Sequence, residues 1–92
     1  MIDTVVVTLS APEFSADFEL PLNEPLAELY YRLLRVLHKT YKDFCVFEGI
    51  VLEKNGAGMI NQSATLADYG VHDGEILSIA DAIKYSLDDM YS

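Results

Sequence analysis

The stretch TLADYGVHDGEILSI, Thr65–Ile79, decides the fold because it joins a helical turn, a loop and a strand with little intervening chain. Ser63 or Thr65 can cap the turn, since a side-chain oxygen there accepts from an otherwise unpaired backbone N–H. Gly70 suits the left-handed position that ends a helical turn. The pattern therefore predicts a tight turn whose inward-facing side chains are Leu66 and Tyr69.

The second half of the stretch predicts a terminal strand. Residues 72–75, HDGE, have the composition of a turn. Residues 76–80 then alternate in a way that buries Leu77 and Ile79 on one face. The domain is expected to end at residue 80, which leaves residues 81–92 as a C-terminal tail.

Two strands are predicted near the start of the chain and two more in its middle. Residues 4–9 are mostly β-branched, residues 14–20 alternate apolar with polar side chains, and the two are expected to pair as a hairpin. Residues 50–53 read as a third strand, and the Asn-Gly that follows favours a tight turn. Met59 and Ile60 are expected to form a short fourth strand.

Residues 25–41 change to helical spacing. Asn23 or Glu24 can cap the start, and Pro25 fits a first turn that has no use for its missing N–H. The basic residues collect toward the C-terminal end, where the helix dipole favours them. The apolar stripe consists of Leu26, Leu29, Tyr30, Leu33, Leu37 and Tyr41.

This order predicts an α+β domain in which one helix packs across one face of a mixed, four- to five-stranded sheet. Only one amphipathic stripe is available to cover the apolar side of the sheet. Ninety-two residues suffice for one core but not for a core and a deep active site. We therefore expect a small module, residues 1–80, that acts through its surface.

Charge narrows the range of partners. The formal net charge is −9, with fifteen acidic and six basic residues. An acidic surface opposes binding to phosphate backbones and anionic lipid, so polypeptide partners are favoured over nucleic acid or membranes. A lone cysteine and the absence of a signal-like or membrane-spanning apolar run favour the cytoplasm. The oligomeric state is left open.

The element order, together with Thr-Leu-x-Asp-Tyr at residues 65–69, resembles ubiquitin and the ubiquitin-like β-grasp fold. The resemblance extends in pattern over about residues 3–80. Among small ubiquitin-like proteins, the chain is most similar to the bacterial YukD family, which accompanies the WXG100-type (type VII) secretion apparatus. That likeness implies a non-conjugated accessory or regulatory interaction protein with protein partners, for which components of the secretion system are the candidates.

One departure from ubiquitin bears on the chemistry. Ubiquitin and the sulfur carriers of the same fold end in Gly-Gly, whereas this chain ends in Asp89-Met90-Tyr91-Ser92 and contains no Gly-Gly pair. Bulky side chains would obstruct the channel of an activating enzyme. Conjugation and sulfur transfer are therefore disfavoured. A modifier or sulfur-carrier protein is kept as the alternative hypothesis, together with a ubiquitin-like binding domain unrelated to secretion.

No motif predicts catalysis or a cofactor. Cys45 could pair with His38 or His72 as a nucleophile, but flanking phenylalanines make a buried structural thiol the simpler reading. His72 is expected to face solvent. No calcium loop, phosphate loop or zinc spacing occurs, so neither a metal nor a cofactor is expected.

Two surfaces are candidates for binding a protein. Alternation directs four apolar side chains to the sheet face opposite the helix, and this predicted open-face group is Val6, Val51, Ile76 and Ala80. The resemblance to ubiquitin places Val6, Val51 and Ala80 close to its partner-binding patch. The second candidate is a basic strip on the helix side away from the core, and it consists of Arg32, Arg35, Lys39 and Lys42.

Both groups also have a purely structural explanation. Scattered surface valines are ordinary, and basic side chains near a helix C-terminus interact favourably with the helix dipole.

The tail carries Ile83, Leu87 and Met90 or Tyr91 at helical spacing. A segment this short is marginal as an isolated helix, so it is expected either to fold back or to wait for a partner.

Overall fold

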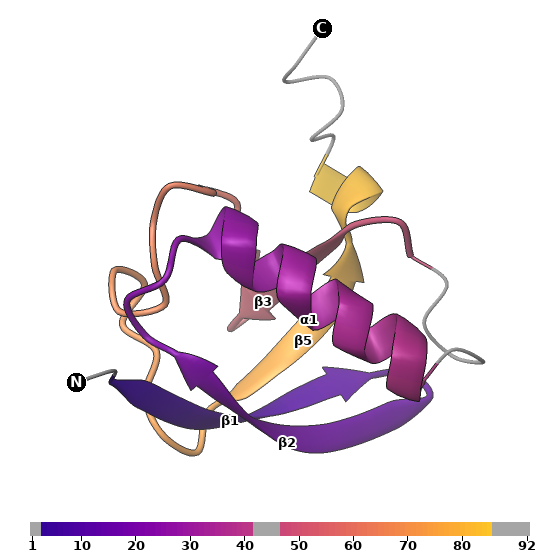
Figure 1. The fold of residues 1–92 in the computed structure, drawn as a ribbon, viewed down its shortest axis with the longest axis horizontal. Coiled ribbons are helices and arrows are strands. Elements are labelled where there is room, and N and C mark those ends of the chain that lie inside the picture. Colours follow the sequence, from indigo (N-terminus) through magenta and orange to yellow (C-terminus); the bar gives the residue numbers. More distant parts are fainter. Residues whose placement is uncertain (1–2, 42–46, 86–92) are drawn as a thin grey trace, which may run out of the picture.

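A computed structural model describes residues 3–41 and 47–85. The chain forms strand β1 (Thr4–Ala11), strand β2 (Phe14–Pro21), helix α1 (Leu26–Thr40), strand β3 (Ile50–Lys54), strand β4 (Ala57–Gly58), strand β5 (Ile76–Asp81) and a 3-10 turn, η1 (Ala82–Tyr85). This order confirms the predicted α+β architecture. Figure 1 shows α1 lying across one side of the sheet.

The sheet has the order β2-β1-β5-β3-β4. β1 pairs antiparallel with β2 and parallel with β5, so the first and last strands lie side by side at the centre. β3 then pairs antiparallel with β5. The sheet is therefore mixed, as its pattern predicted, and β2 and β4 form its edges.

The core lies between α1 and the sheet. The helical stripe is buried from Leu26 to Leu37, while Tyr41 is half-buried at the end of the helix. Alternate residues of the strands complete the layer, as predicted. Leu77 and Ile79 are buried as predicted. The full set of buried sheet residues on the helix side is Val5, Val7, Leu9, Ile50, Leu52, Leu77 and Ile79.

The turn at residues 65–70 forms as predicted and is tied to the start of α1. The Asp68 N–H donates to Thr65 Oγ1 at 3.1 Å, and the Thr65 N–H donates to Asp68 Oδ2 at 3.0 Å. Gly70 has φ +70, which an L side chain rarely adopts. Leu66 is fully buried, so this turn fixes the loop against the core.

Two local predictions were wrong. Neither Asn23 nor Glu24 caps α1: Pro25 is the N-cap and makes no side-chain capping bond. The first helical N–H groups are instead paired by a loop, because Leu26 N donates to Ala64 O at 2.8 Å. The fourth strand is Ala57–Gly58 and not Met59–Ile60.

The shift of β4 follows from the turn before it. Asn55 and Gly56 both have positive φ and form a two-residue connection, as the Asn-Gly dipeptide predicted. Such a turn pairs its flanking residues directly, so Lys54 lies opposite Ala57. The strand must therefore begin immediately after Gly56.

Tyr30 links α1 to β3 and to the residue that follows β4. Its buried hydroxyl donates to Met59 O at 2.7 Å and accepts from Leu52 N at 3.3 Å. Burial raises the pKa of this hydroxyl, so it remains a neutral donor. The neighbouring Tyr31 is exposed.

We predict that Tyr30→Phe lowers the free energy of unfolding by about 1–3 kcal/mol, because it leaves a buried carbonyl without its donor. Tyr31→Phe is the matched control and should change it by less than about 0.5 kcal/mol. Urea denaturation followed by circular dichroism measures both. Equal effects of the two substitutions would contradict the structural role assigned to Tyr30.

Candidate protein-interaction surfaces

The sheet face opposite α1 has an exposed apolar pair at its centre. Val6 is 46% exposed and Ile76 is 66% exposed. Thr8, two residues after Val6 on the same face, lies directly opposite Ile76 in the parallel ladder. Val6 and Ile76 are thus exposed where the alternation predicted, and we call them the Val6–Ile76 patch.

The other two members of the predicted open-face group are not exposed. Val51 is fully buried and Ala80 is 8% exposed. The two lie opposite one another in the β3–β5 ladder, on the face away from α1. Their predicted face is therefore consistent with the ladder, but their predicted exposure is wrong.

The covering segment is η1, which follows β5 without a break. Ala82 and Tyr85 both pack against the core cluster that contains Val51. The ring of Tyr85 lies over Gly58, where an added Cβ would come within 2.5 Å of it. Gly58 pairs with Glu53, which shares its face with Val51, so Tyr85 closes that part of the sheet. We call this contact the Tyr85 seal.

Polar bonds hold the Tyr85 seal at its rim. The Tyr85 hydroxyl donates to Glu53 Oε2, and Lys84 Nζ donates to the same oxygen at 2.8 Å. The Lys84 bond, then the Tyr85 bond, lowers the pKa of the Glu53 carboxyl. The carboxylate in turn raises the pKa of the Tyr85 hydroxyl. Glu53 is therefore the ionised acceptor on which both side chains converge.

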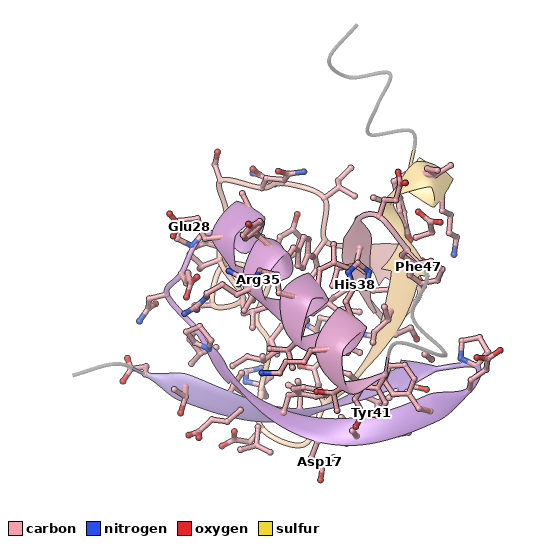
Figure 2. The ribbon with its side chains drawn as sticks, turned by 45° about the vertical axis from the view of Figure 1, so that its right-hand side comes forward. Asp17, Glu28, Arg35, His38, Tyr41 and Phe47 are labelled. Atoms are coloured by element: carbon pink, nitrogen blue, oxygen red, sulfur yellow. The ribbon has the colours of Figure 1, made fainter. Side chains whose placement is uncertain are left out.

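The β1–β2 part of the same face is polar and acidic. Thr4 Oγ1 donates to Glu19 Oε2 at 2.7 Å, and Thr8 Oγ1 donates to Asp17 Oδ1 at 2.7 Å. Figure 2 shows Asp17 projecting from β2 on the side away from α1. The open face therefore contains an acidic half, the Val6–Ile76 patch and the Tyr85 seal.

The described members of the basic strip lie on the exposed surface of α1. Arg32 forms an ion pair with Glu24. The Arg35 guanidinium lies 5.8 Å from the centroid of the Tyr31 ring, within cation–π range. Lys39 is exposed, whereas Lys42 lies outside the described residues. Figure 2 shows Arg35 on the exposed side of the helix.

The residues considered for catalysis are not brought together in the described parts of the chain. His38 Nε2 bonds to the Phe47 carbonyl oxygen at 2.7 Å, and His72 is exposed, as predicted. Cys45 lies outside the described residues. Within residues 3–41 and 47–85, no group of three or more His, Cys, Asp or Glu side chains could hold a metal ion.

Two features escaped sequence reasoning. The Tyr85 seal joins residues far apart in the chain, and neither Gly58 nor Tyr85 belongs to a local motif. A groove between β2 and α1 was also missed, although the alternation of Phe18 and Leu20 with polar residues places both on the helix side. The period-two pattern could have indicated that Phe18 and Leu20 line the groove, but not that the helix leaves the groove open to solvent.

The fold defines a class: a mixed sheet of this order crossed by one helix is a ubiquitin-like β-grasp domain. The ubiquitin-like domain of the Mycobacterium tuberculosis type VII secretion protein EccD1 has the same fold, with a TM-score of 0.73 and 21% identity over 87% of this chain and 100% of that one. The EccD5 ubiquitin-like domain from Mycobacterium xenopi gives 0.71 and 19% identity over 85% and 93%.

A solved ESX-5 inner membrane complex, described as MycP5-free and in State II, contains a similar part. It matches with a TM-score of 0.66 and 19% identity over 96% of this chain, but this chain spans only 26% of that one. No curated protein matches the sequence. The family model that matches residues 4–79 is "WXG100 protein secretion system (Wss), protein YukD". The chain belongs to the YukD family.

None of the helices in the described part of the chain has the length and apolar character needed to cross a membrane.

We predict that Gly58→Ala displaces Tyr85, because the new methyl would occupy the position of the ring. The substitution should lower the free energy of unfolding in the native sequence and have little effect in a Tyr85→Ala background. A double-mutant cycle by urea denaturation measures this coupling. Additive effects of the two substitutions would show that ring and glycine are not in contact.

The Tyr85 seal is also predicted to loosen in acid. Because the folded-state pKa of Glu53 is lowered from its ordinary value of 4.5, its contribution is complete above that pH and is lost as pH falls through the lowered value. NMR of the Tyr85 ring and the Val51 methyls against pH measures the change. Glu53→Gln should remove the pH dependence, and an unchanged profile in that variant would exclude Glu53 as the titrating group.

Proposed function

We propose that this protein is a non-conjugated ubiquitin-like interaction module that serves as an accessory or regulatory component of a bacterial WXG100-type (type VII) secretion system. In this proposal it acts in the cytoplasm by surface contact with protein partners and carries out no catalysis. Components of the secretion machinery are the proposed partners.

The observation that carries the proposal is the family match. It spans residues 4–79, from the first residue of β1 into β5, so it covers the β-grasp domain and not one short motif. The EccD domains of type VII systems supply a second, weaker line of support, since they share the fold. A small β-grasp domain offers surfaces more readily than an enclosed site.

The surfaces proposed for this role are the Val6–Ile76 patch and the described part of the basic strip. Val6 and Ile76 offer exposed apolar area beside an acidic half-face, while Arg35 and Lys39 offer positive charge on the other side of the molecule. Such different surfaces suit different partners, or two regions of one partner. Val51 and Ala80 enter the proposal only as residues that become accessible when the Tyr85 seal opens.

We predict that Val6→Asp with Ile76→Asp changes the set of proteins recovered by crosslinking and pull-down from the native host. Both residues are exposed, so the fold should tolerate the change. Ser78→Asp, at an exposed position between Ile76 and Ala80 on β5, is the matched control. Recovery of the same proteins by every variant would remove this patch from the proposal.

Intact-mass measurement on the same host material tests the noncovalent character of the interaction. The proposal predicts a single mass for the unmodified polypeptide. A thiocarboxylate, a covalent adduct or a ladder of conjugates would instead support the carrier or modifier alternative. Recovery of partners with no link to secretion would support a binding domain of other use.

A further inference from the structure

We propose that Gly58 and Glu53, on the β3–β4 hairpin, form a tyrosine-binding site, and that a partner polypeptide with a tyrosine next to a lysine binds there by displacing Tyr85. We call it the Gly58 site. In the structure the chain's own Lys84 and Tyr85 fill it, so the Tyr85 seal is a ligand bound in cis. The inference rests on the proposed function in taking the partner to be a polypeptide, and it adds the chemistry that this partner must present.

The first support is the shape of the Gly58 site. Gly58 pairs with Glu53, so a side chain at residue 58 would project from the same face of the sheet as Glu53. The Tyr85 ring takes that space, because an added Cβ would lie 2.5 Å from its Cζ and 2.6 Å from its Cε1. The backbone of Gly58 does not have the positive φ of Gly56 or Gly70. The ring, and not the backbone, therefore accounts for a glycine at this position.

The second support is the acceptor at the rim. Glu53 Oε2 accepts from the Tyr85 hydroxyl and from Lys84 Nζ, the latter at 2.8 Å. Lys84 Nζ also lies 5.6 Å from the centroid of the Tyr85 ring, within cation–π range. The site thus holds the lysine and the tyrosine as one unit. When they leave, the Glu53 carboxylate loses both of these donors, and a ligand must replace them.

The third support is the weak attachment of the cis occupant. η1 is a single turn of four residues, none of which is buried. Ala82 N donates to Gly49 O at 3.0 Å. Ile83, which is 68% exposed, donates its N–H to Asp81 Oδ1 at 3.1 Å. A terminal segment with so few buried contacts opens at a low cost in free energy, so the site becomes available without unfolding of the sheet.

Charge defines which tyrosine the site accepts. The Glu53 carboxyl has an ordinary pKa of 4.5, which the Lys84 and Tyr85 bonds lower further, so it is ionised near neutral pH whether the site is open or closed. An ionised acceptor needs a donor, and phenylalanine has none. A phosphotyrosine would place its negative charge opposite the carboxylate. The site therefore favours an unmodified tyrosine, and an adjacent lysine supplies the second donor.

A second copy of this chain is a less suitable occupant. It carries the same Lys84 and Tyr85, but its net charge of −9 repels an identical molecule. Exchange between two copies would also require both seals to open. A different polypeptide with a basic residue beside its tyrosine meets neither obstacle, because positive charge is attracted to this acidic chain.

The test is an NMR titration with the peptide acetyl-Ala-Ile-Lys-Tyr-amide, which has the sequence of residues 82–85. The receptor is the full chain with Tyr85→Ala, in which the ring no longer fills the site. We expect amide shifts at Glu53 and Gly58. Tyr85→Ala with Gly58→Ala is the matched control and should not bind, because its new methyl occupies the place of the ring. No binding to Tyr85→Ala at millimolar concentration would overturn the proposal.

Two further peptides test the chemistry of the ligand. Phenylalanine in place of the tyrosine should weaken binding about tenfold, because a hydrogen bond to a charged acceptor is lost. Phosphotyrosine in the same place should abolish binding, because it repels Glu53. Equal binding of all three peptides would overturn the assignment of a tyrosine site.

The native chain tests displacement directly, and it serves equally if Tyr85→Ala fails to fold. It should bind the tyrosine peptide about tenfold or more weakly than Tyr85→Ala, because only molecules with an open site are competent. The Tyr85 ring signals should move toward those of an exposed tyrosine as the peptide is added. Equal affinities, or ring signals that stay unchanged on binding, would show that the peptide and Tyr85 do not share a site.

Sedimentation of the native chain over a range of concentrations tests the other occupant. We expect no dimer that depends on the Gly58 site. A dimer that forms as concentration rises and is lost in Gly58→Ala would assign the exchange to a second copy and overturn the proposal. No secretion component enters these experiments, so their failure is distinguishable from failure of the proposed function in the pull-down.

Discussion

The rest of the structure depends on one constraint: a single amphipathic helix can cover only one face of a five-stranded sheet. The stripe of α1, from Leu26 to Leu37, buries the alternate residues of β1, β5 and β3 that face it. Burial of apolar side chains is the dominant favourable contribution to folding. The loop at residues 62–70 stabilises the same contact by pairing the first N–H groups of α1. Side chains on the sheet face that this helix does not cover must be either covered by another segment, polar, or exposed to solvent.

The opposite face has three parts, which differ in polarity and in exposure to solvent. At β1 and β2, threonine hydroxyls bond to Asp17 and Glu19 and make the surface polar. At β3 and β5, the Tyr85 seal removes Val51 from solvent. Between them, the Val6–Ile76 patch stays exposed. Because α1 also leaves the β2 edge open, the described part of this YukD-family chain exposes several surfaces of different character.

Local patterns predicted what local interactions determine. The β-branched run of β1, the alternation of β2, the helical stripe of α1 and the Asn55-Gly56 turn each depend on neighbours in sequence, and each formed as predicted. The fourth strand was misplaced for a local reason, the two-residue turn before it, but the other failed predictions depended on distant residues. Backbone carbonyls of a later loop replaced a side-chain cap, and Val51 and Ala80 are buried on the side of the sheet where Tyr85 packs over Gly58. Alternation assigns a residue to a face, but whether another segment covers that face depends on contacts that no local pattern encodes.

Methyl NMR with a soluble gadolinium chelate measures most directly which methyl groups on the sheet face opposite α1 are exposed to solvent. The chelate broadens the signals of methyl groups that solvent reaches. We expect strong broadening of the Val6 and Ile76 methyls and little broadening of those of Val51 and Ala80, in the full chain near neutral pH. Equal broadening of all four would contradict the account, because it would show that one helix leaves the entire opposite face open.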